Sequence, residues 1–212
     1  IYTLSLHDAL PIFFTYAGLI VAAVLYEDEH KNGNIKNAVA FGISREKLFL
    51  GKCMTAVLTA TVIMALVLIA YIGSAWFLLE HTGPTSLKII LTEIPAVYGT
   101  AVGSMILGIA LLAYIKNEVM AAMLWAVIIY VIPKVLLLAG MVLLAQWGIE
   151  FLWDFAQLLP ANLFQFGAEV NMSHCEVLWK TSQGMTKCVI VGIVGTVLAI
   201  VAGIVMLRKK EV

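Results

Sequence analysis

The sequence predicts an all-α polytopic membrane protein, with five transmembrane helices present and six expected in the intact protein. Of its 212 residues, 62% are hydrophobic and only 12% are charged, and the mean hydropathy is +1.00. A soluble domain carries about a quarter charged residues. The charges here cluster between apolar runs that are too long for a soluble core. No alternating pattern typical of membrane β-strands occurs.

Five apolar runs are predicted to span the membrane. The first, residues 10–26, is short for a span, which needs about 20 residues. The others are residues 53–79, 94–115, 119–145 and 187–207. A tight polar break at residues 116–118 predicts that the third and fourth runs form a helical hairpin.

Residues 1–12 do not fit this pattern. They lack an initiator Met, a basic n-region and a small-residue cleavage site, so they are not a signal peptide. The string resembles translated sequencing-adapter read-through. We expect a non-native leader over residues 1–12 and a single transmembrane domain over residues 13–212.

The fourth run contains Pro133 followed by Lys134. A proline removes a backbone hydrogen bond and kinks a helix. A lysine within a span costs several kcal/mol unless it snorkels or pairs. Two interpretations stay open for these residues: a polar position on a substrate pathway, or a lysine near the outer surface whose ammonium group snorkels to water.

Residues 146–186 form a long outer region rich in aromatic and acidic side chains. Apolar residues at helical spacing before Pro160 predict short interfacial or re-entrant helices. Cys175 and Cys188 belong to this outer side, and a bridge between them and simple packing roles are both left open. With Cys53 the count is odd and fits no metal spacing.

Basic residues predict the orientation. Residues 27–52, Lys116 and the tail at residues 208–210 lie on one side, whereas mainly Lys88 and Lys180 lie on the other. The first side, including the C-terminus, is therefore predicted to be cytoplasmic. An odd number of spans would leave the N-terminus outside, so we expect one further helix upstream.

The sequence lacks the residues that proton-coupled transport, zinc proteolysis and ATP hydrolysis require. No acidic residue lies within the last four apolar runs, no His-Glu-x-x-His zinc motif occurs, and no Walker-type phosphate loop occurs. The sequence therefore predicts no catalytic residue, no metal site and no cofactor bound by this chain. The zero net charge offers no basic field for nucleic acid. Energy for transport would have to enter from another subunit.

Residues 27–52 form the long polar segment of the N-terminal half. A turn at residues 32–34 precedes an apolar edge that includes Ile35 and Phe41. Ser44 is a predicted N-cap for a helix that begins at Arg45 and continues into the second span. The pattern fits either an ordinary cytosolic loop or a short helix that docks on a soluble partner.

The spacing of Glu27, Gly33, Ile35-Lys36-Asn37, Gly42-Ile43-Ser44-Arg45 and Gly51-Lys52 resembles the loop between the second and third helices of type-2 ABC exporter permeases. The layout that follows, including residues 159–162 before the last span, is similar too. The resemblance implies a permease that forms the substrate pathway as a homo- or heterodimer in the bacterial cytoplasmic membrane. A separate ATP-binding cassette subunit would bind ATP and Mg. Relatives with this short layout include lantibiotic- and bacitracin-immunity permeases.

In that family the loop is a coupling helix that docks on the cassette. Carried over, the partner-binding residues are Glu27, Gly33, Ile35, Lys36, Asn37, Phe41, Ser44 and Arg45. Small residues at four-residue spacing are candidates for helix packing or for the dimer contact. They are Gly99, Gly103, Gly195, Ala199 and Gly203.

A rival interpretation is a membrane scaffold or sensor subunit that does not transport and whose loop recruits another cytosolic protein. An intramembrane enzyme would need polar catalytic residues that the spans do not provide. A neighbouring open reading frame for a cassette ATPase would favour the exporter.

Overall fold

The computed structural model describes residues 13–24, 41–78, 87–115, 117–165 and 182–209. Within these ranges every regular element is a helix, which confirms the predicted all-α class. Among the described residues, four helical segments are long and apolar enough to cross a membrane, where the sequence predicted five spans. They are Arg45–Ser74, Val97–Tyr114, Glu118–Trp147 and Thr186–Arg208. The first apolar run forms a shorter helix, Phe13–Val24.

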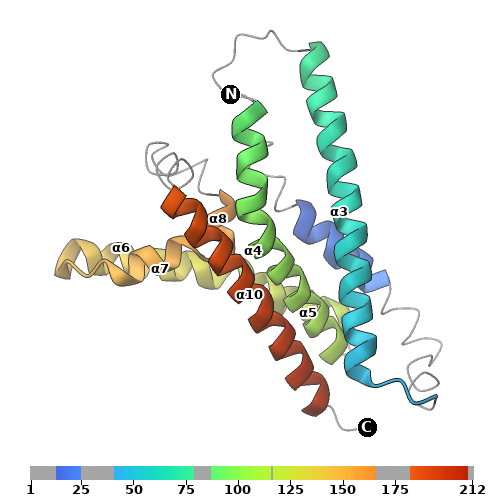
Figure 1. Cartoon of the computed structure of the whole chain (residues 1–212). Helices are drawn as coiled ribbons and strands as arrows, with labels where there is room; N and C mark the ends of the chain where they lie inside the picture. Colours follow the sequence, from blue (N-terminus) through green and yellow to red (C-terminus); the bar gives the residue numbers. More distant parts are fainter. Residues whose placement is uncertain (1–12, 25–40, 79–86, 116, 166–181, 210–212) are drawn as a thin grey trace.

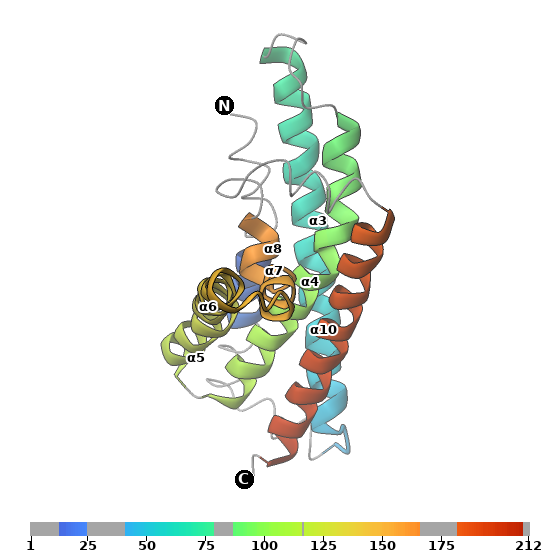
Figure 2. The same ribbon diagram turned by 90° about the vertical axis from the view of Figure 1, so that its left-hand side faces the viewer.

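Three long helices define the body of the molecule (Figure 1). They are α3 (Arg45–Leu78), α4 (Leu87–Tyr114) and α10 (Ser182–Lys209). Helices α4 and α10 lie side by side and run in the same direction, whereas α3 runs the opposite way, in both Figure 1 and Figure 2. The start of α3 and the ends of α4 and α10 therefore lie at one end of the bundle.

Helix α4 is the centre of the packing. Of its candidate span, 78% is buried inside the chain, against 17–22% for the other three. The helix Phe13–Val24 packs on it because Gly108 has no side chain. A Cβ there would lie 2.5 Å from Cδ1 of Leu19 and 3.0 Å from Cδ1 of Trp125. The other three candidate spans leave broad apolar faces exposed, as expected of helices that face lipid.

The fourth apolar run is irregular in the middle. Helix α5 (Glu118–Ala126) begins at Asn117, whose side chain accepts hydrogen bonds from the backbone N–H groups of Val119 and Met120. A π-helical segment, η1 (Val127–Val131), separates it from α6 (Ile132–Trp147).

Helix α6 then reverses into α7 (Phe151–Gln157). Gly148 makes the turn with φ 67° and ψ 22°, a left-handed conformation that favours glycine. The two helices pack tightly because a Cβ on Gly140 would lie 2.9 Å from the Cα of Trp153. The pair α6–α7, here called the arm, projects sideways from the bundle in Figure 1 and is seen nearly end-on in Figure 2. Helix α8 (Pro160–Gln165) follows.

The predicted outer helices are therefore present, but they pack against the fourth span and against each other. Proline begins α8, a position where its missing N–H has no cost. Cys53 and Cys188 are buried free cysteines. Cys175 lies outside the described residues, and its candidate partner Cys188 is in the free thiol form.

Candidate functional site

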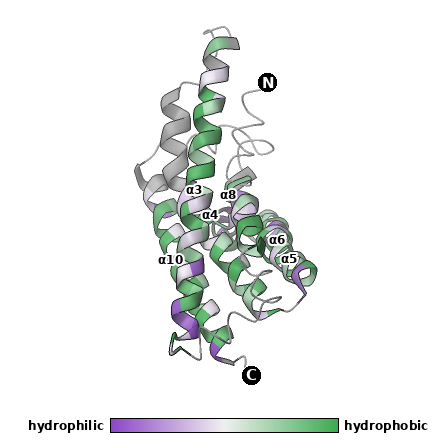
Figure 3. Cartoon of the chain, turned by 90° about the vertical axis from the view of Figure 1, so that its right-hand side faces the viewer, coloured by the Kyte–Doolittle hydropathy of each residue, from purple (hydrophilic) through white to green (hydrophobic). Residues whose placement is uncertain are grey.

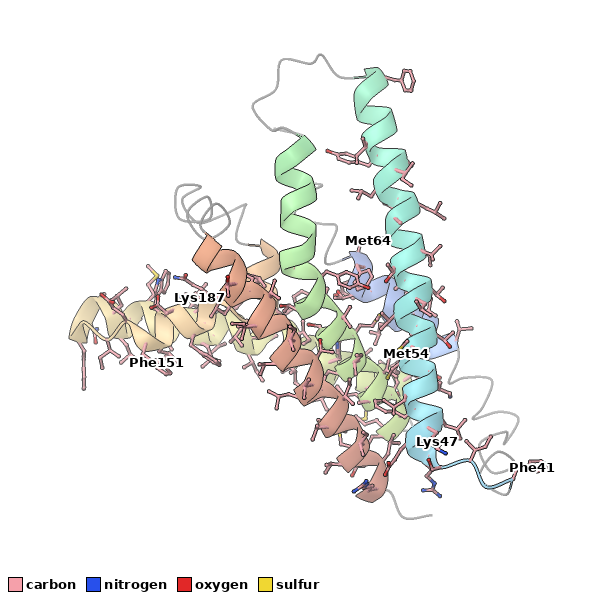
Figure 4. All side chains as sticks on the ribbon, viewed as in Figure 1. Phe41, Lys47, Met54, Met64, Phe151 and Lys187 are labelled. Atoms are coloured by element: carbon pink, nitrogen blue, oxygen red, sulfur yellow. The ribbon has the colours of Figure 1, made fainter. Side chains whose placement is uncertain are left out.

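The segment before α3 presents an exposed apolar edge. Phe41 is 88% exposed and points away from the bundle in Figure 4, and Ile43 is also exposed. Gly42 between them has φ 86°, a left-handed backbone conformation that explains glycine at this position. The other predicted partner-binding residues of this segment lie outside the described residues: Glu27, Gly33, Ile35, Lys36 and Asn37.

Ser44 begins α3, as the sequence predicted. Its Oγ accepts a hydrogen bond of 3.4 Å from the backbone N–H of Lys47, and its carbonyl accepts the first helical bond from Leu48. Arg45 is the first helical residue and is partly buried. The exposed apolar edge is therefore continuous with a long rigid helix, so a force on the edge acts directly on α3.

This end of α3 is joined to the end of α10. The guanidinium Nε of Arg208 donates a 2.7 Å hydrogen bond to the carboxylate of Glu46 and forms an ion pair with it. One turn further along α3, the buried ring of Phe49 packs on Gly203 of α10, and a Cβ added to Gly203 would also lie 3.1 Å from the Cβ of Ala110 on α4. Figure 3 shows hydrophilic residues gathered at this end, while the shafts of the helices are hydrophobic.

The small residues of α4 and α10 pack against each other within one chain. A Cβ on Gly103 would lie 3.0 Å from the backbone N of Thr196 and 3.1 Å from the carbonyl carbon of Gly195. Thr196 Oγ1 donates to the carbonyl of Gly99 at 3.0 Å. Ala199 is buried near this crossing. These contacts account for Gly99 and Gly103 without a second copy of the chain, whereas a Cβ added to Gly195 would meet no heavy atom within 4 Å in the described structure.

One residue of this crossing was missed from the sequence. A Cβ added to Gly192 would lie 2.9 Å from the Cα of Gly99. The spacing Gly192-x-x-x-Thr196 fits the small-residue pattern if threonine is counted as small. A pattern of glycine and alanine alone does not include this pair.

Pro133 and Lys134 lie at the start of α6, directly after η1. The backbone N–H of Ile132 bonds to the carbonyl of Val127, five residues back, so the helix departs from α-helical geometry directly before the proline. The kink that the sequence predicts at Pro133 stays a prediction. Pro133 is buried and Lys134 is partly buried. No ion pair to Lys134 occurs among the described residues, so the pathway and snorkelling interpretations both stand.

Two further polar side chains hold the structure near this site. Trp125 is 1% exposed, and its indole N–H donates a 2.7 Å bond to the carbonyl of Ser104 on α4. Asn162 of α8 bonds the carbonyl of Pro133. The sequence singled out neither role, because both partners are backbone carbonyls that leave no residue pattern.

Within the described ranges, no group of three or more His, Cys, Asp or Glu side chains is arranged to hold a metal ion. A family profile described as ABC-2 family transporter protein matches residues 2–134, more than half of the chain. The match includes residues 2–12 and extends through Lys134. Neither the curated proteins nor the solved structures contain a match. More than half of the chain matches this profile, and its described helices include four that are long and apolar enough to cross a membrane. The chain therefore belongs to the ABC-2 transporter family and is a multi-pass membrane protein.

Proposed function

We propose that this chain is the permease subunit of an ATP-driven exporter, and that residues 27–52 couple it to a separate ATP-binding cassette subunit. Family membership supports a transporter membrane subunit that is not itself the ATPase. The observation that carries the coupling role is the exposed edge at Phe41 and Ile43, placed directly before the capped start of α3. An apolar side chain that is 88% exposed outside the spans is suited to a protein partner.

The contacts behind this edge explain how docking could act on the spans. Movement of the edge reaches α3 at Ser44, and α3 is joined to α10 through Glu46 and Arg208 and through Phe49 on Gly203. Closure of two cassettes would then move two permeases, arranged as a dimer, against each other. In this proposal the end that carries Phe41 and the C-terminus faces the cytoplasm of a bacterial cell. ATP and Mg would bind in the cassette.

The substrate class is proposed on the resemblance alone. Permeases with this layout export antimicrobial peptides or confer immunity to them, so lantibiotics and bacitracin are the first compounds to test. Expression of the chain with its neighbouring cassette should raise the inhibitory concentration of one such peptide. Unchanged susceptibility to all of them would set this substrate class aside.

The coupling role is tested by Phe41→Ala and Gly33→Pro in the protein co-expressed with its cassette. We expect both variants to reach the membrane but to lose cassette pull-down and substrate-stimulated ATP hydrolysis, because a docked helix depends on a few anchor residues. Phe77→Ala is the matched control, since Phe77 is 86% exposed on α3 but near the end of that helix that lies far from Phe41. Leu66→Ala is a second control on the exposed shaft.

Wild-type pull-down and ATP turnover in both Phe41→Ala and Gly33→Pro would reject the coupling role. The scaffold or sensor interpretation would then be preferred, and the cytosolic protein recovered with the chain would not be an ATPase.

A further inference from the structure

The arm is attached to the bundle at its base. The main contacts of α6 and α7 are with each other, with η1 and with α8, whereas α8 also contacts α4. The arm is thus linked to the bundle by the backbone of η1 and by the packing of α8. Its angle to the bundle depends on these two attachments.

The backbone attachment is a weak point of the helix. Residues Val127–Val131 are π-helical, and Pro133 directly after them has no N–H to donate. A π-helical segment followed by proline is a common site of helix bending. The regular hydrogen bonds that would stiffen the joint are therefore reduced where the arm begins.

A side chain bridges this joint. Asn162 Nδ2 donates two hydrogen bonds of 2.8 Å each, one to the carbonyl of Pro133 and one to the carbonyl of Ala156. Both neighbours are acceptors, so the amide nitrogen and not the oxygen must face them. Asn162 is 1% exposed, so water does not compete for these bonds. One carboxamide thus joins the first turn of α6, the last turn of α7 and α8.

The joint also holds unused hydrogen-bonding groups. Asn162 Oδ1 and Gln157 Nε2 are buried and without a hydrogen-bond partner among the described residues. One is an acceptor and the other a donor, and they lie at the base of the arm on adjacent helices. Buried polar atoms without partners are rare in native proteins.

From these contacts we infer that Asn162 is a positioning residue that holds the arm at a fixed angle to the bundle. It does so by tying α8 to the Pro133 joint of the fourth span. The inference rests on the proposed function only for its consequence in transport. During transport, breaking of the Asn162 hydrogen bonds lets the arm move relative to α4. A variant that lacks these bonds has no defined resting position of the arm.

The test follows the position of the arm by a spin-label distance between the arm and α3. Phe151→Cys at the start of α7 and Leu66→Cys on α3 provide exposed sites, at 78% and 62%. Figure 4 shows Phe151 on the arm, away from the bundle. The three native cysteines are replaced by alanine so that only these sites react.

Asn162→Leu and Asn162→Asp each remove the amide N–H donors, the first with an apolar side chain and the second with a polar one of nearly the same shape. We expect a broader or shifted distance distribution in both. Gln157→Leu is the matched control, because it removes a buried carboxamide from the same base whose N–H group makes no bond, and it should keep the parent distribution.

An unchanged distribution in either recovered Asn162 variant overturns the inference, and so does an equal change in Gln157→Leu. The result is independent of the cassette. If the arm loosens in the Asn162 variants but the parent chain never binds a cassette, the proposed function fails and the positioning role stands. With a working transporter, the Asn162 variants should lose transport while cassette pull-down is retained.

Discussion

Gly99 of α4 and Gly192 of α10 meet backbone to backbone. A Cβ added to Gly192 would lie 2.9 Å from the Cα of Gly99, and one added to Gly99 would lie 3.1 Å from the Cα of Gly192. These are backbone atoms of two packed helices, so neither can move without separating the helices. Close approach of this kind replaces the hydrophobic effect as the source of helix association inside a membrane.

Gly192→Ala should therefore destabilise the protein relative to Gly195→Ala. Both changes add the same methyl group to α10 and gain the same helix propensity, but an added Cβ on Gly195 meets no heavy atom within 4 Å in the described structure. We expect Gly192→Ala to be less stable by about 1–3 kcal/mol, the usual cost of overpacking. Thermal unfolding of the purified protein in detergent measures the difference. Equal melting temperatures for the two variants would show that α4 and α10 are not in close backbone contact at Gly192.

Phe49 and Gly203 should behave as a coupled pair. The ring of Phe49 is 2% exposed and occupies the space that a side chain at position 203 would need. Gly203→Ala alone should lower the melting temperature, and Phe49→Leu should reduce that loss when the two are combined, since contacting residues are not additive. The four proteins of this double-mutant cycle decide the question: strictly additive changes would mean that the two residues do not touch.

Trp125→Phe should cost about 0.5–1.5 kcal/mol for the lost hydrogen bond to Ser104, and more for the smaller ring in a packed core. Trp147→Phe is the control, because Trp147 is 74% exposed at the end of α6. Chemical or thermal unfolding in detergent compares the two. Equal loss of stability in both variants would contradict a special role for the Trp125 indole.

The orientation predicts opposite labelling at two exposed positions. In a background without the native cysteines, Phe41→Cys should be protected from a membrane-impermeant thiol reagent added to intact cells, and Glu150→Cys at the tip of the arm should react. Both residues are exposed in the structure. After the membrane is permeabilised, both should react. Labelling of Phe41→Cys in intact cells would reverse the orientation drawn from the basic residues.

Local signals in the sequence predicted local structure well. Ser44 is a side chain that caps a helix by itself, so its position alone predicted where α3 begins. Pro133 predicted a kink because the missing N–H is a property of the residue, and the π-helical segment lies directly before it. The glycines at 99 and 103 marked a packing face, although not which helix would cover it.

Features that depend on which residue a side chain contacts could not be predicted from the sequence. The aromatic residues after Trp147 are equally suited to a membrane interface or to packing on α6, and only the contact of Gly140 with Trp153 distinguishes the two. The role of Asn162 depends on carbonyls 29 and 6 residues away, which no sequence pattern marks. Of the predicted coupling residues, the structure describes only Phe41, Ser44 and Arg45, and their partner role stays a prediction.

The packing of α4 against α10 also sets an order for biogenesis. The candidate span Val97–Tyr114 of α4 has the lowest mean hydropathy of the four, and its glycine face is covered by α10, which the ribosome makes well after α4. Until α10 emerges, the backbone around Gly99 and Gly103 faces lipid or a chaperone in the membrane. Nascent chains that stop before residue 182 therefore lack the contact that closes the core, and quality-control proteases should distinguish them from chains that include α10.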